Sequence, residues 1–468
     1  MPPVFVSGGS QVLAQAEPSL SEAASWLRDY LRTDTTNPPG NEHRGAALLA
    51  RILRDEGINY RLLVTPEGRT SLYARLPATV ETQEQGGASE DASGDASGDA
   101  LVLMHHIDVV PASDDWDHEP FSGDVVDGYL WGRGAIDVKS LGIAQLAAMV
   151  ELARSDAPRH RDVVLLAVAD EENGGGRGSG WLVEHHPELF EGVGAILNEG
   201  GANRFVGGRV LWWGIEVAQK RPLWIRVSAS GRGGHAAGLN PFSATHKLVA
   251  ALGRLLEMPP EYRVTPGVRL YMKAVAPLHG DRLRPLMEDI DSVIGPEGAK
   301  KRLMPGMIGL FMDTVQITRL EAGDRINTIV PEAWAEVDIR LLPDIESEVF
   351  LQRVKDVLGD DVDVEVLVTS PPALHAPVDS RAYQTLEEVF AREGDVVPAF
   401  ISGFTDSRYF RARGIPTYGV SPFALTGEEL RGIHARNERI SIQAFDDGVE
   451  RMTAILRAYV RPEKDEEN

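Results

Sequence analysis

Acidic side chains follow two short apolar runs near the middle of the chain. Three acids, residues 170–172, come shortly after the run 163–168, and Glu199 comes shortly after the run 193–197. Both runs are rich in Val, Leu and Ile and too short for a typical helix, which predicts buried strands. Ligands bind at the carboxyl ends of parallel strands, where clustered carboxylates repel one another unless a cation lies between them. These residues therefore predict a metal site.

Five residues at breaks in the apolar pattern are candidate metal ligands: His106, Asp137, Glu172, Glu199 and His434. Each of them alone is weak support, because a single His or Glu near a strand end is more often a structural residue. Together, two imidazoles and three carboxylates suit a pair of zinc ions about 3.5–4 Å apart that share one carboxylate. Two divalent ions and one hydroxide would also leave this ligand set neutral overall.

Two residues beside His106 affect this interpretation. Asp108 is predicted to accept a hydrogen bond from the ring nitrogen that faces away from the metal, which would fix the tautomer of the ligand. The alternative is that Asp108 only begins a turn before Pro111. His105 competes with His106 as the ligand, but its place within the predicted strand 101–105 indicates that it packs inward.

Glu171 is predicted to act in proton transfer rather than as a ligand. Adjacent residues in an extended segment point to opposite sides, so Glu171 is not needed as a ligand if Glu172 is one. Near water whose pKa a metal has lowered towards 7, a carboxylate can take a proton and later deliver it to a leaving amine. The alternative is a solvated loop acid, which is the commoner role of a glutamate.

The elements that position these residues alternate between strand and helix. Strands at 101–105, 163–168 and 193–197 are expected to lie side by side, and a helix is expected at 140–154. This pattern predicts an α/β catalytic domain with a mainly parallel sheet, formed by residues 1–219 and 371–468. Its further predicted elements are helices at 19–31, 42–56, 381–392 and 441–460 and strands at 60–64, 71–76 and 417–420.

A different pattern between residues 220 and 370 predicts an inserted α+β domain. The predicted strands are 223–229, 313–318, 334–340 and 362–368, with helices at 241–256 and 347–358. Two strand-helix-strand units of this kind form a small ferredoxin-like sheet with helices on one face. Residues 257–312 are irregular and rich in Pro, Arg and Met, and the pattern does not place them. The acidic stretch 81–100 is predicted to be a mobile hairpin loop, and the charged C-terminal end a solvated tail.

Composition excludes several classes of function. The chain has 468 residues with 70 Asp and Glu against 47 Lys and Arg, a formal charge of −23, which opposes binding to nucleic acid or an anionic membrane. It contains no cysteine, so a metal has to be held by His, Asp and Glu. The start lacks the features of a signal peptide, and no run approaches eighteen apolar residues. We therefore expect a cytoplasmic protein.

Five segments of the sequence together resemble one enzyme family. They are His106-Ile-Asp108-Val-Val-Pro, Gly132-Arg-Gly-Ala-Ile-Asp137-Val-Lys, Asp170-Glu171-Glu172, Asn198-Glu199-Gly200 and Ile433-His434-Ala-Arg-Asn437-Glu438. In this order they are similar to the motifs of the co-catalytic dinuclear zinc peptidases, which include aminoacylase, carboxypeptidase G, acetylornithine deacetylase and succinyl-diaminopimelate desuccinylase. The resemblance extends from about residue 20 to residue 460. His105 departs from it, because this position is commonly glycine in the family.

The resemblance assigns each candidate ligand to one of two ions. It implies that Asp137 bridges the metals, that His106 and Glu199 complete one ion, and that Glu172 and His434 complete the other. It further implies that Glu171 is the general base, and that residues from about 220 to 370 form a lid that commonly dimerises. Zinc is the expected metal, with cobalt or manganese as possible substitutes.

The resemblance also assigns residues that contact the substrate. His235, in the stretch Gly231-Arg-Gly-Gly-His235, is implied to reach the partner subunit's active site and stabilise the oxyanion. Asn327 and Arg340 are implied to hold the substrate's free carboxylate, for which a planar guanidinium is suited. A surface ion pair remains the alternative for Arg340. Arg408, in the segment 402–408, is implied to line the pocket.

The predicted activity is hydrolysis of the peptide or N-acyl bond of a small substrate with a free carboxylate, such as an N-acyl amino acid or a dipeptide. Water held between the two metals would lose a proton to Glu171 and attack the carbonyl. Two alternatives use the same residues: a binding protein without turnover, and a two-metal phosphoesterase. Loss of Glu171 or of a ligand would favour the first. The acidic composition and the lack of a basic phosphate cradle make the second less favoured.

Overall fold

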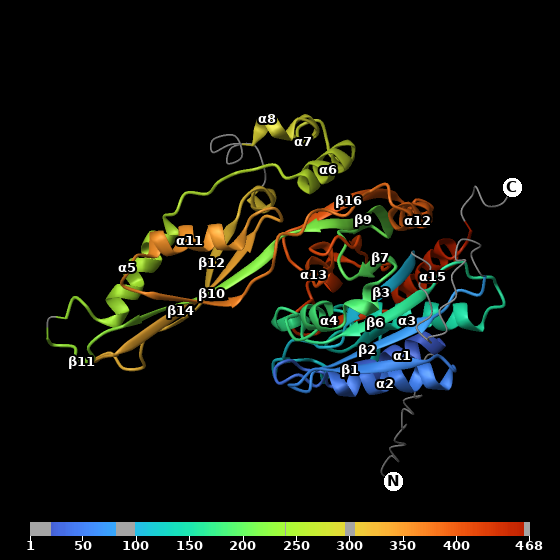
Figure 1. Cartoon of the computed structure of the whole chain (residues 1–468), viewed down its shortest axis with the longest axis horizontal. Coiled ribbons are helices and arrows are strands. Elements are labelled where there is room, and N and C mark those ends of the chain that lie inside the picture. Colours follow the sequence, from blue (N-terminus) through green and yellow to red (C-terminus); the bar gives the residue numbers. More distant parts are fainter. Residues whose placement is uncertain (1–19, 81–98, 239, 295–304, 463–468) are drawn as a thin grey trace, which may run out of the picture.

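Two sheets organise the structure, one in a large α/β domain and one in a smaller domain that projects from it (Figure 1). The structure is a computed structural model that describes residues 20–80, 99–238, 240–294 and 305–462. Most of the acidic stretch, residues 81–98, and the end of the charged tail, residues 463–468, lie outside the described residues. The predicted fold class, a mainly parallel α/β domain with an inserted α+β domain, is confirmed.

The large sheet contains nine strands in the order β1-β2-β6-β3-β7-β17-β9-β16, with β8 paired to β9. Strand β6 is parallel to β3, β3 to β7, β7 to β17 and β9 to β16, so the centre of the sheet is parallel as predicted. The strands are β1 (Tyr60–Val64), β2 (Thr70–Leu76), β3 (Ala100–His106), β6 (Val163–Val168), β7 (Val193–Asn198), β8 (Arg204–Val206), β9 (Arg209–Gln219), β16 (Asp395–Ile401) and β17 (Thr417–Gly419).

Helices cover both faces of this sheet, which explains why its central strands are apolar without alternation. Alternate residues of β6 belong to two different cores: Val163 and Leu165 pack with one layer of helices, and Val164 and Leu166 pack with the other. The first layer contains α1 (Glu22–Leu31), α2 (Glu42–Asp55), α3 (Lys139–Arg154), α12 (Arg381–Phe390) and α15 (Ile442–Tyr459), and the second contains α4 (Ser179–His185) and α13 (Ser407–Arg411).

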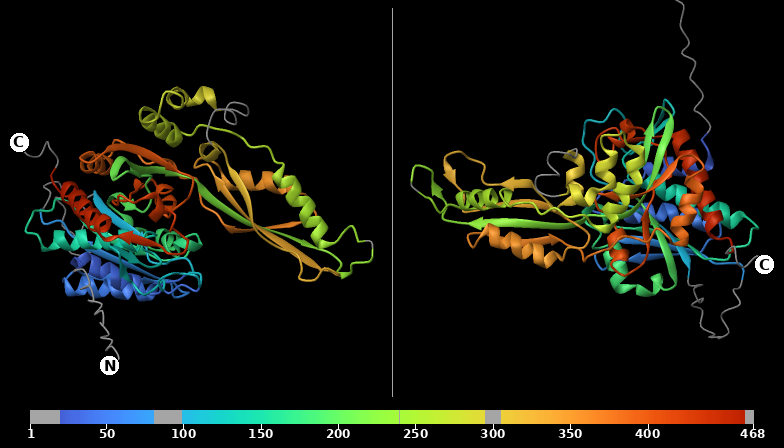
Figure 2. Two further views of the ribbon diagram at one scale, coloured as in Figure 1. Left: turned by 180° about the vertical axis from the view of Figure 1, so that it is seen from behind. Right: turned by 90° about the horizontal axis from the view of Figure 1, so that it is seen from above.

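The smaller domain, called the lid below, is a four-stranded antiparallel sheet with two helices on one face. Its strand order is β12-β14-β10-β15, and its chain order is strand, helix, strand, strand, helix, strand, which is the predicted ferredoxin-like arrangement. The elements are β10 (Arg221–Ser230), α5 (Ala244–Leu256), β12 (Thr314–Glu321), β14 (Glu332–Leu341), α11 (Ser347–Leu358) and β15 (Asp363–Val368). Alternate residues such as Leu223, Ile225 and Val227 face the two helices and form a core separate from that of the large domain. Two views show the lid extending well away from the large domain (Figure 2).

The segment 257–312, which the sequence pattern did not place, contains several helices in its described residues 257–294 and 305–312. It forms α6 (Pro266–Val275), α7 (Arg284–Glu288), α8 (Ile290–Val293) and α10 (Pro305–Ile308). Although it is inserted between lid elements, Val268, Met272 and Val275 of α6 join the core of the large domain, beside β16 and β9. This helical segment therefore enlarges the large domain rather than the lid sheet.

The sequence analysis did not predict strands β9 and β16. Pro398 lies within β16 and cannot donate a ladder hydrogen bond, and the structure places β16 at the edge of the sheet, where a proline is tolerated. A third, small sheet joins β4 (Val125–Val126), β5 (Tyr129–Trp131) and β18 (Arg439–Ser441). None of the described helices is long and apolar enough to span a membrane.

Candidate metal centre and active site

The candidate ligands meet at one edge of the large sheet. Strand β3 ends at His106, and its two parallel neighbours β6 and β7 end just before Glu172 and Glu199. Asp137 precedes α3, and His434 follows the short helix α14 (Gly427–Leu430). The three strands were predicted to lie side by side, and the structure places them in the order β6-β3-β7, which brings these distant parts of the chain together.

Asp137 lies between the two histidines and places one carboxylate oxygen against each of them. Its Oδ1 is 3.1 Å from His106 Nε2, and its Oδ2 is 3.0 Å from His434 Nε2. The second neighbour of His106 Nε2 is Glu199 Oε2 at 3.6 Å, and that of His434 Nε2 is Glu172 Oε2 at 3.2 Å. The five residues thus form two half-sites, each with one imidazole and one glutamate, that share Asp137.

The geometry of the half-sites fits two divalent metal ions. Two ligands bound to one zinc ion at about 2.0–2.2 Å and at tetrahedral angles lie roughly 3.3–3.6 Å apart, which is close to the observed separations. The atom Glu172 Oε1 is buried without a hydrogen-bond partner among the described residues, so it is available to a cation. Imidazole nitrogens and carboxylate oxygens are the donors that zinc and similar ions prefer when no thiolate is present.

The titration behaviour of these groups shows what balances the acids when no cation is bound. Hydrogen bonds to Asp137 and Glu172 raise the pKa of His434 to about 10. Burial alone would lower the pKa of His106, but Glu199 and Asp137 raise it well above its ordinary value. A metal ion binds the neutral imidazole, so the raised pKa values of the two histidines mean that metal binding is coupled to proton release.

Glu171 faces the same cluster without belonging to either half-site. It offers a carboxylate oxygen within 4.8 Å of the ligand atoms of His106 and Glu199. Burial, and next the charge of Glu199, raise the pKa of Glu171 well above its ordinary value. The local conformation differs from the one expected, because residues Glu171–Asn173 form a 3-10 turn rather than an extended segment. The turn begins at Asp170, whose φ of 70° is uncommon for a residue other than glycine.

Asp108 contacts His106 through a different atom from the one predicted. The Nδ1 atom of His106 is 2.8 Å from the backbone carbonyl oxygen of Asp108, whereas the nearest carboxylate oxygen of Asp108 is 3.8 Å away. The buried carboxylate instead accepts hydrogen bonds from the backbone N–H groups of Glu171 and Glu172 at 3.1 and 3.2 Å, and from Asn37 Nδ2 at 2.8 Å. Asp108 therefore fixes both His106 and the acidic turn.

The sequence analysis missed a second positioning carboxylate, that of Glu438. This fully buried side chain accepts hydrogen bonds from the backbone N–H groups of Gly134, Ile136 and Asp137 at 2.8–3.0 Å, and from Arg133 at 2.8 Å. It fixes the loop that carries the shared ligand. Glu438 is the last residue of the segment Ile433–Glu438, which contains His434, so its position in the sequence marked it as a candidate. The sequence did not reveal which loop its carboxylate contacts.

His105 and Arg408 are both buried and do not line the site. His105 Nδ1 lies 3.1 Å from Gln145 Oε1, and burial lowers the pKa of His105 to about 3, so His106 is the histidine that faces the cluster, as predicted. Arg408 was expected to line the pocket. Its side chain is instead fully buried and donates hydrogen bonds to the carbonyl oxygens of Gly174 and Thr405. Arg408 therefore stabilises the loop after Glu172 through its hydrogen bond to Gly174.

The predicted lid residues occupy two different places. His235 and Asn327 are exposed neighbours in a ribbon formed by β11 (Gly234–His235) and β13 (Thr328–Ile329), at the end of the lid that lies away from the large domain (Figure 1). Within one chain the structure does not bring them to the metal cluster. Arg340 lies at the junction of the domains, paired with Asp338 at 2.6 Å and with its guanidinium 4.4 Å from the ring centre of Phe404.

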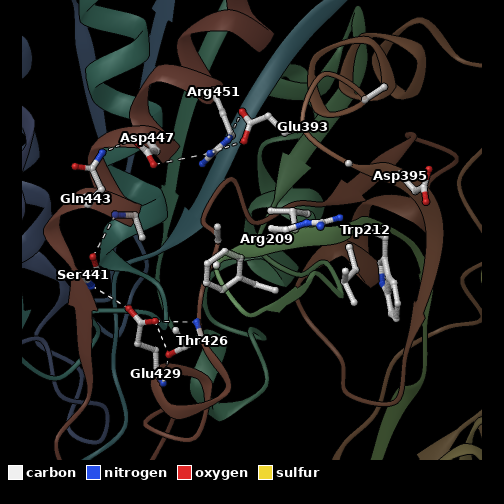
Figure 3. A pocket seen from close by; sticks show the side chains of 18 of the residues that line it. Arg209, Trp212, Glu393, Asp395, Thr426, Glu429, Ser441, Gln443, Asp447 and Arg451 are labelled. Carbon is white, nitrogen blue, oxygen red and sulfur yellow. Dashed lines mark hydrogen bonds and ion pairs between the residues drawn. The ribbon is translucent and has the colours of Figure 1, made fainter. Parts of the chain in front are cut away.

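A groove of about 1040 Å³ on the large domain contains none of the predicted site residues. Figure 3 shows that some of its charged side chains are paired: Arg451 contacts Glu393, and Glu429 closes a capping box with Thr426. Glu429 also accepts a hydrogen bond from the backbone of Ser441. Because the groove contains none of the five candidate ligands, the chemistry is assigned to the ligand cluster around Asp137.

Comparison with known proteins identifies the family of the chain. The sequence matches Peptidase family M20/M25/M40 over residues 102–458. Aminoacylase-1B of Rattus norvegicus is 26% identical over 444 residues, which cover 92% of this chain and 94% of that protein. Two solved structures share the fold. The M20 family metallo-carboxypeptidase Sso-CP2 of Sulfolobus solfataricus has a TM-score of 0.73 and 19% identity, and covers 94% of this chain and 99% of its own.

The second structure is the YXEP protein of Bacillus subtilis, a dinuclear metal binding peptidase, with a TM-score of 0.56, 15% identity and coverage of 94% and 98%. The family match covers most of the chain, including every residue of the two half-sites. This chain therefore belongs to Peptidase family M20/M25/M40 and is a metal-dependent amidohydrolase.

Proposed function

We propose that this amidohydrolase uses two zinc ions to cleave the peptide or N-acyl bond of a small substrate with a free carboxylate, such as an N-acyl amino acid or a dipeptide. The observation that carries the proposal is the division of the Asp137 carboxylate between His106 and His434. Two divalent ions in these half-sites would polarise the amide carbonyl and lower the pKa of water. Cobalt or manganese would fit the same donors.

Glu171 carries the proton in this reaction. The attacking water gives a proton to the Glu171 carboxylate while its oxygen bonds to the carbonyl carbon. Glu171 then gives the proton to the nitrogen, and the C–N bond breaks to release an acid and an amine. The position of Glu171 beside His106 and Glu199 supports this role, since a general base has to lie within reach of the proton that it takes.

The lid supplies substrate contacts in this proposal. Arg340, and Asn327 from a partner subunit, would bind the free carboxylate, and His235 of the partner subunit would donate to the carbonyl oxygen as it becomes negative. Support comes from the exposure of His235 and Asn327 at the lid end, and from large apolar side chains exposed on the lid, including Phe242, Val249 and Leu256. A second copy of the chain would cover such a surface.

A substrate panel tests the proposed reaction. N-acetyl amino acids and dipeptides are incubated with the metal-loaded protein, with the protein after chelation, and with the Glu171→Gln variant, and p-nitrophenyl phosphate serves as a control for phosphoesterase activity. We expect amide hydrolysis only by the metal-loaded protein. Hydrolysis that survives both chelation and Glu171→Gln would contradict the mechanism. Cleavage of the phosphate ester without cleavage of any amide would contradict the substrate class.

The contribution of the partner is tested by mixing two inactive variants. In a dimer of one Glu171→Gln chain and one His235→Ala chain, the second chain keeps its base and receives an intact histidine from the first. We expect activity to return on mixing, relative to either variant alone. If no activity returns although mixed dimers form, His235 does not act across the interface.

A further inference from the structure

A pocket of about 250 Å³ opens directly beside two metal ligands, Asp137 and Glu199. It lies between the start of α3, the segment that follows Glu199, the segment 420–425 and the loop that carries His434. Because Asp137 and Glu199 form part of its wall, the pocket is adjacent to the proposed metal site. A substrate whose amide is bound at the metals can therefore place another of its groups in this pocket. The inference below rests on the proposed function and concerns the part of the substrate that enters this pocket.

The pocket is mainly apolar: besides the two ligands, Asn203 and Ser421 are the only polar residues in its described lining. Leu141, Val420 and Phe423 form a buried floor, and Leu430 and Ile433 at the rim are 43% and 37% exposed. Large apolar side chains exposed next to a metal ligand are expected where an apolar group of a ligand covers them. None of the described lining residues other than Asp137 and Glu199 carries a charge.

The one amide side chain in the wall is already engaged. Asn203 donates hydrogen bonds through Nδ2 to the carbonyl oxygens of Ser421 and Phe423 at 2.8 and 3.3 Å. Its Oδ1 accepts a hydrogen bond from the backbone N–H of Gly214 at 3.0 Å. A polar group of a substrate would therefore lose its water without gaining a partner from Asn203, which favours an apolar occupant.

A second pocket, which contains none of the five candidate ligands, lies towards the lid. This pocket, of about 500 Å³ between the acidic turn and the lid, is lined by Arg69, Asn173 and Arg177 together with Val368 of β15. Arg69 is already paired with Glu42 and Asp170, so it does not supply a free charge. The two substituents of a trans amide point away from each other, about 3.8 Å apart at their first carbons. In the proposed function the free carboxylate lies at Arg340 of the lid, which directs the acyl group away from the lid, towards the apolar pocket, whose described lining contains no lid residue.

We propose that this pocket receives the acyl group of the substrate and selects apolar acyl groups of limited length. Its volume holds on the order of eight groups the size of a water molecule, at about 30 Å³ each. It is smaller than the ~300–1,000 Å³ typical of sites for drug-sized ligands. Longer chains have to leave the pocket over Leu430 and Ile433.

The test is a series of N-acyl derivatives of one amino acid, from acetyl to decanoyl, with kcat/KM measured on the metal-loaded full chain. We expect kcat/KM to rise roughly fourfold per added methylene, from ~0.8 kcal/mol per buried methylene, and to level off by about eight carbons. In Leu430→Ala and in Ile433→Ala, the ratio of octanoyl to acetyl kcat/KM should fall by roughly fivefold. Leu62→Ala is the matched control, because Leu62 is 46% exposed on β1 and away from the pocket, and it should keep the wild-type ratio.

Calorimetry on the Glu171→Gln variant provides a second readout. Binding of the same series should become tighter with chain length and show an increasingly negative heat-capacity change, which is the signature of apolar burial. Two results would contradict the acyl pocket but not the proposed hydrolase: turnover that does not depend on chain length, and a chain-length dependence that neither rim variant changes. Tighter binding without turnover of any member supports the pocket and contradicts the proposed reaction. Absence of both binding and turnover overturns both proposals.

Discussion

His106 and His434 approach opposite oxygens of one carboxylate, at 3.1 Å from Asp137 Oδ1 and 3.0 Å from Asp137 Oδ2. The two histidines come from the first and last parts of the chain, on either side of the inserted lid. The folded large domain alone brings them together, so the metal centre depends on the association of its two segments. The geometry also predicts how each surrounding residue contributes to activity and stability.

Replacing the proposed base should separate catalysis from metal binding. In Glu171→Gln we expect kcat/KM for an N-acetyl amino acid to fall by about 10²–10⁴, because the variant cannot take the proton from water. Bound metal, measured by elemental analysis, should stay at the wild-type level, whereas Glu172→Gln should reduce it. Activity within a few-fold of wild type in Glu171→Gln would contradict the assigned role.

Metal stabilisation should increase with pH. In the metal-free protein, contacts with Asp137 and Glu172 raise the pKa of His434 to about 10. The stabilisation by the imidazolium is therefore complete below the unfolded pKa of roughly 6.5, and it disappears as the pH rises through about 10. Metal requires the neutral imidazole and binds better as the pH rises. The Tm difference between metal-loaded and chelated protein should therefore grow between pH 6 and pH 9. A difference that shrinks over this range would contradict the account.

The carboxylate of Glu438 should matter for metal affinity without touching the metal. In Glu438→Gln, an NH₂ group replaces one of the two oxygens that accept hydrogen bonds from the loop of Asp137. The NH₂ group cannot accept these hydrogen bonds, so backbone N–H groups of the loop lose their acceptor. We expect a loss of about 1–3 kcal/mol in the free energy of unfolding and of about 10–100-fold in metal affinity. Glu428→Gln, at an exposed carboxylate paired with Arg439, is the matched control and should change neither quantity appreciably. Equal effects of the two substitutions would argue against a positioning role.

The packing of His105 against α3 gives a stability prediction. A Cβ atom added at Gly142 would lie 2.4 Å from the buried ring of His105, so Gly142→Ala should lower the free energy of unfolding by about 1–3 kcal/mol. Gly253 in α5 has no atom within 4 Å of such a Cβ, and Gly253→Ala should raise the stability by about 0.4–1 kcal/mol. Chemical denaturation of both variants checks the contrast. A stabilising Gly142→Ala would contradict the packing described here.

The sequence predicted that the candidate metal ligands lie close together, because this depends on a simple relationship. Parallel strands with continuous apolar runs lie in the middle of a sheet, and the residues that follow them meet at one edge. The atomic partners of Asp108 and the turn at Glu171 were not predictable, because they depend on the local path of the backbone after each strand ends. A pattern of residue types does not distinguish a carboxylate that bonds a ligand ring from one that bonds a neighbouring loop.

Two other differences have tertiary causes. Arg408 belongs to a segment that resembles a pocket loop, but its burial depends on how α13 packs against the loop at Gly174, and a cationic residue gives no sign of this in the sequence. Strand β16 contains Pro398, which lowers strand propensity, and only its place at the sheet edge makes the strand acceptable. In both cases contacts distant in the sequence override the local pattern.

In the proposed metal centre, Asp137 is shared by two metal ions, one with His106 and Glu199 and one with Glu172 and His434. The most direct test of this arrangement is anomalous diffraction at the zinc edge from crystals of the zinc-loaded protein. The account predicts two peaks per chain, about 3.5–4 Å apart, on the two sides of the Asp137 carboxylate. A single peak, or peaks that do not contact Asp137, would contradict it.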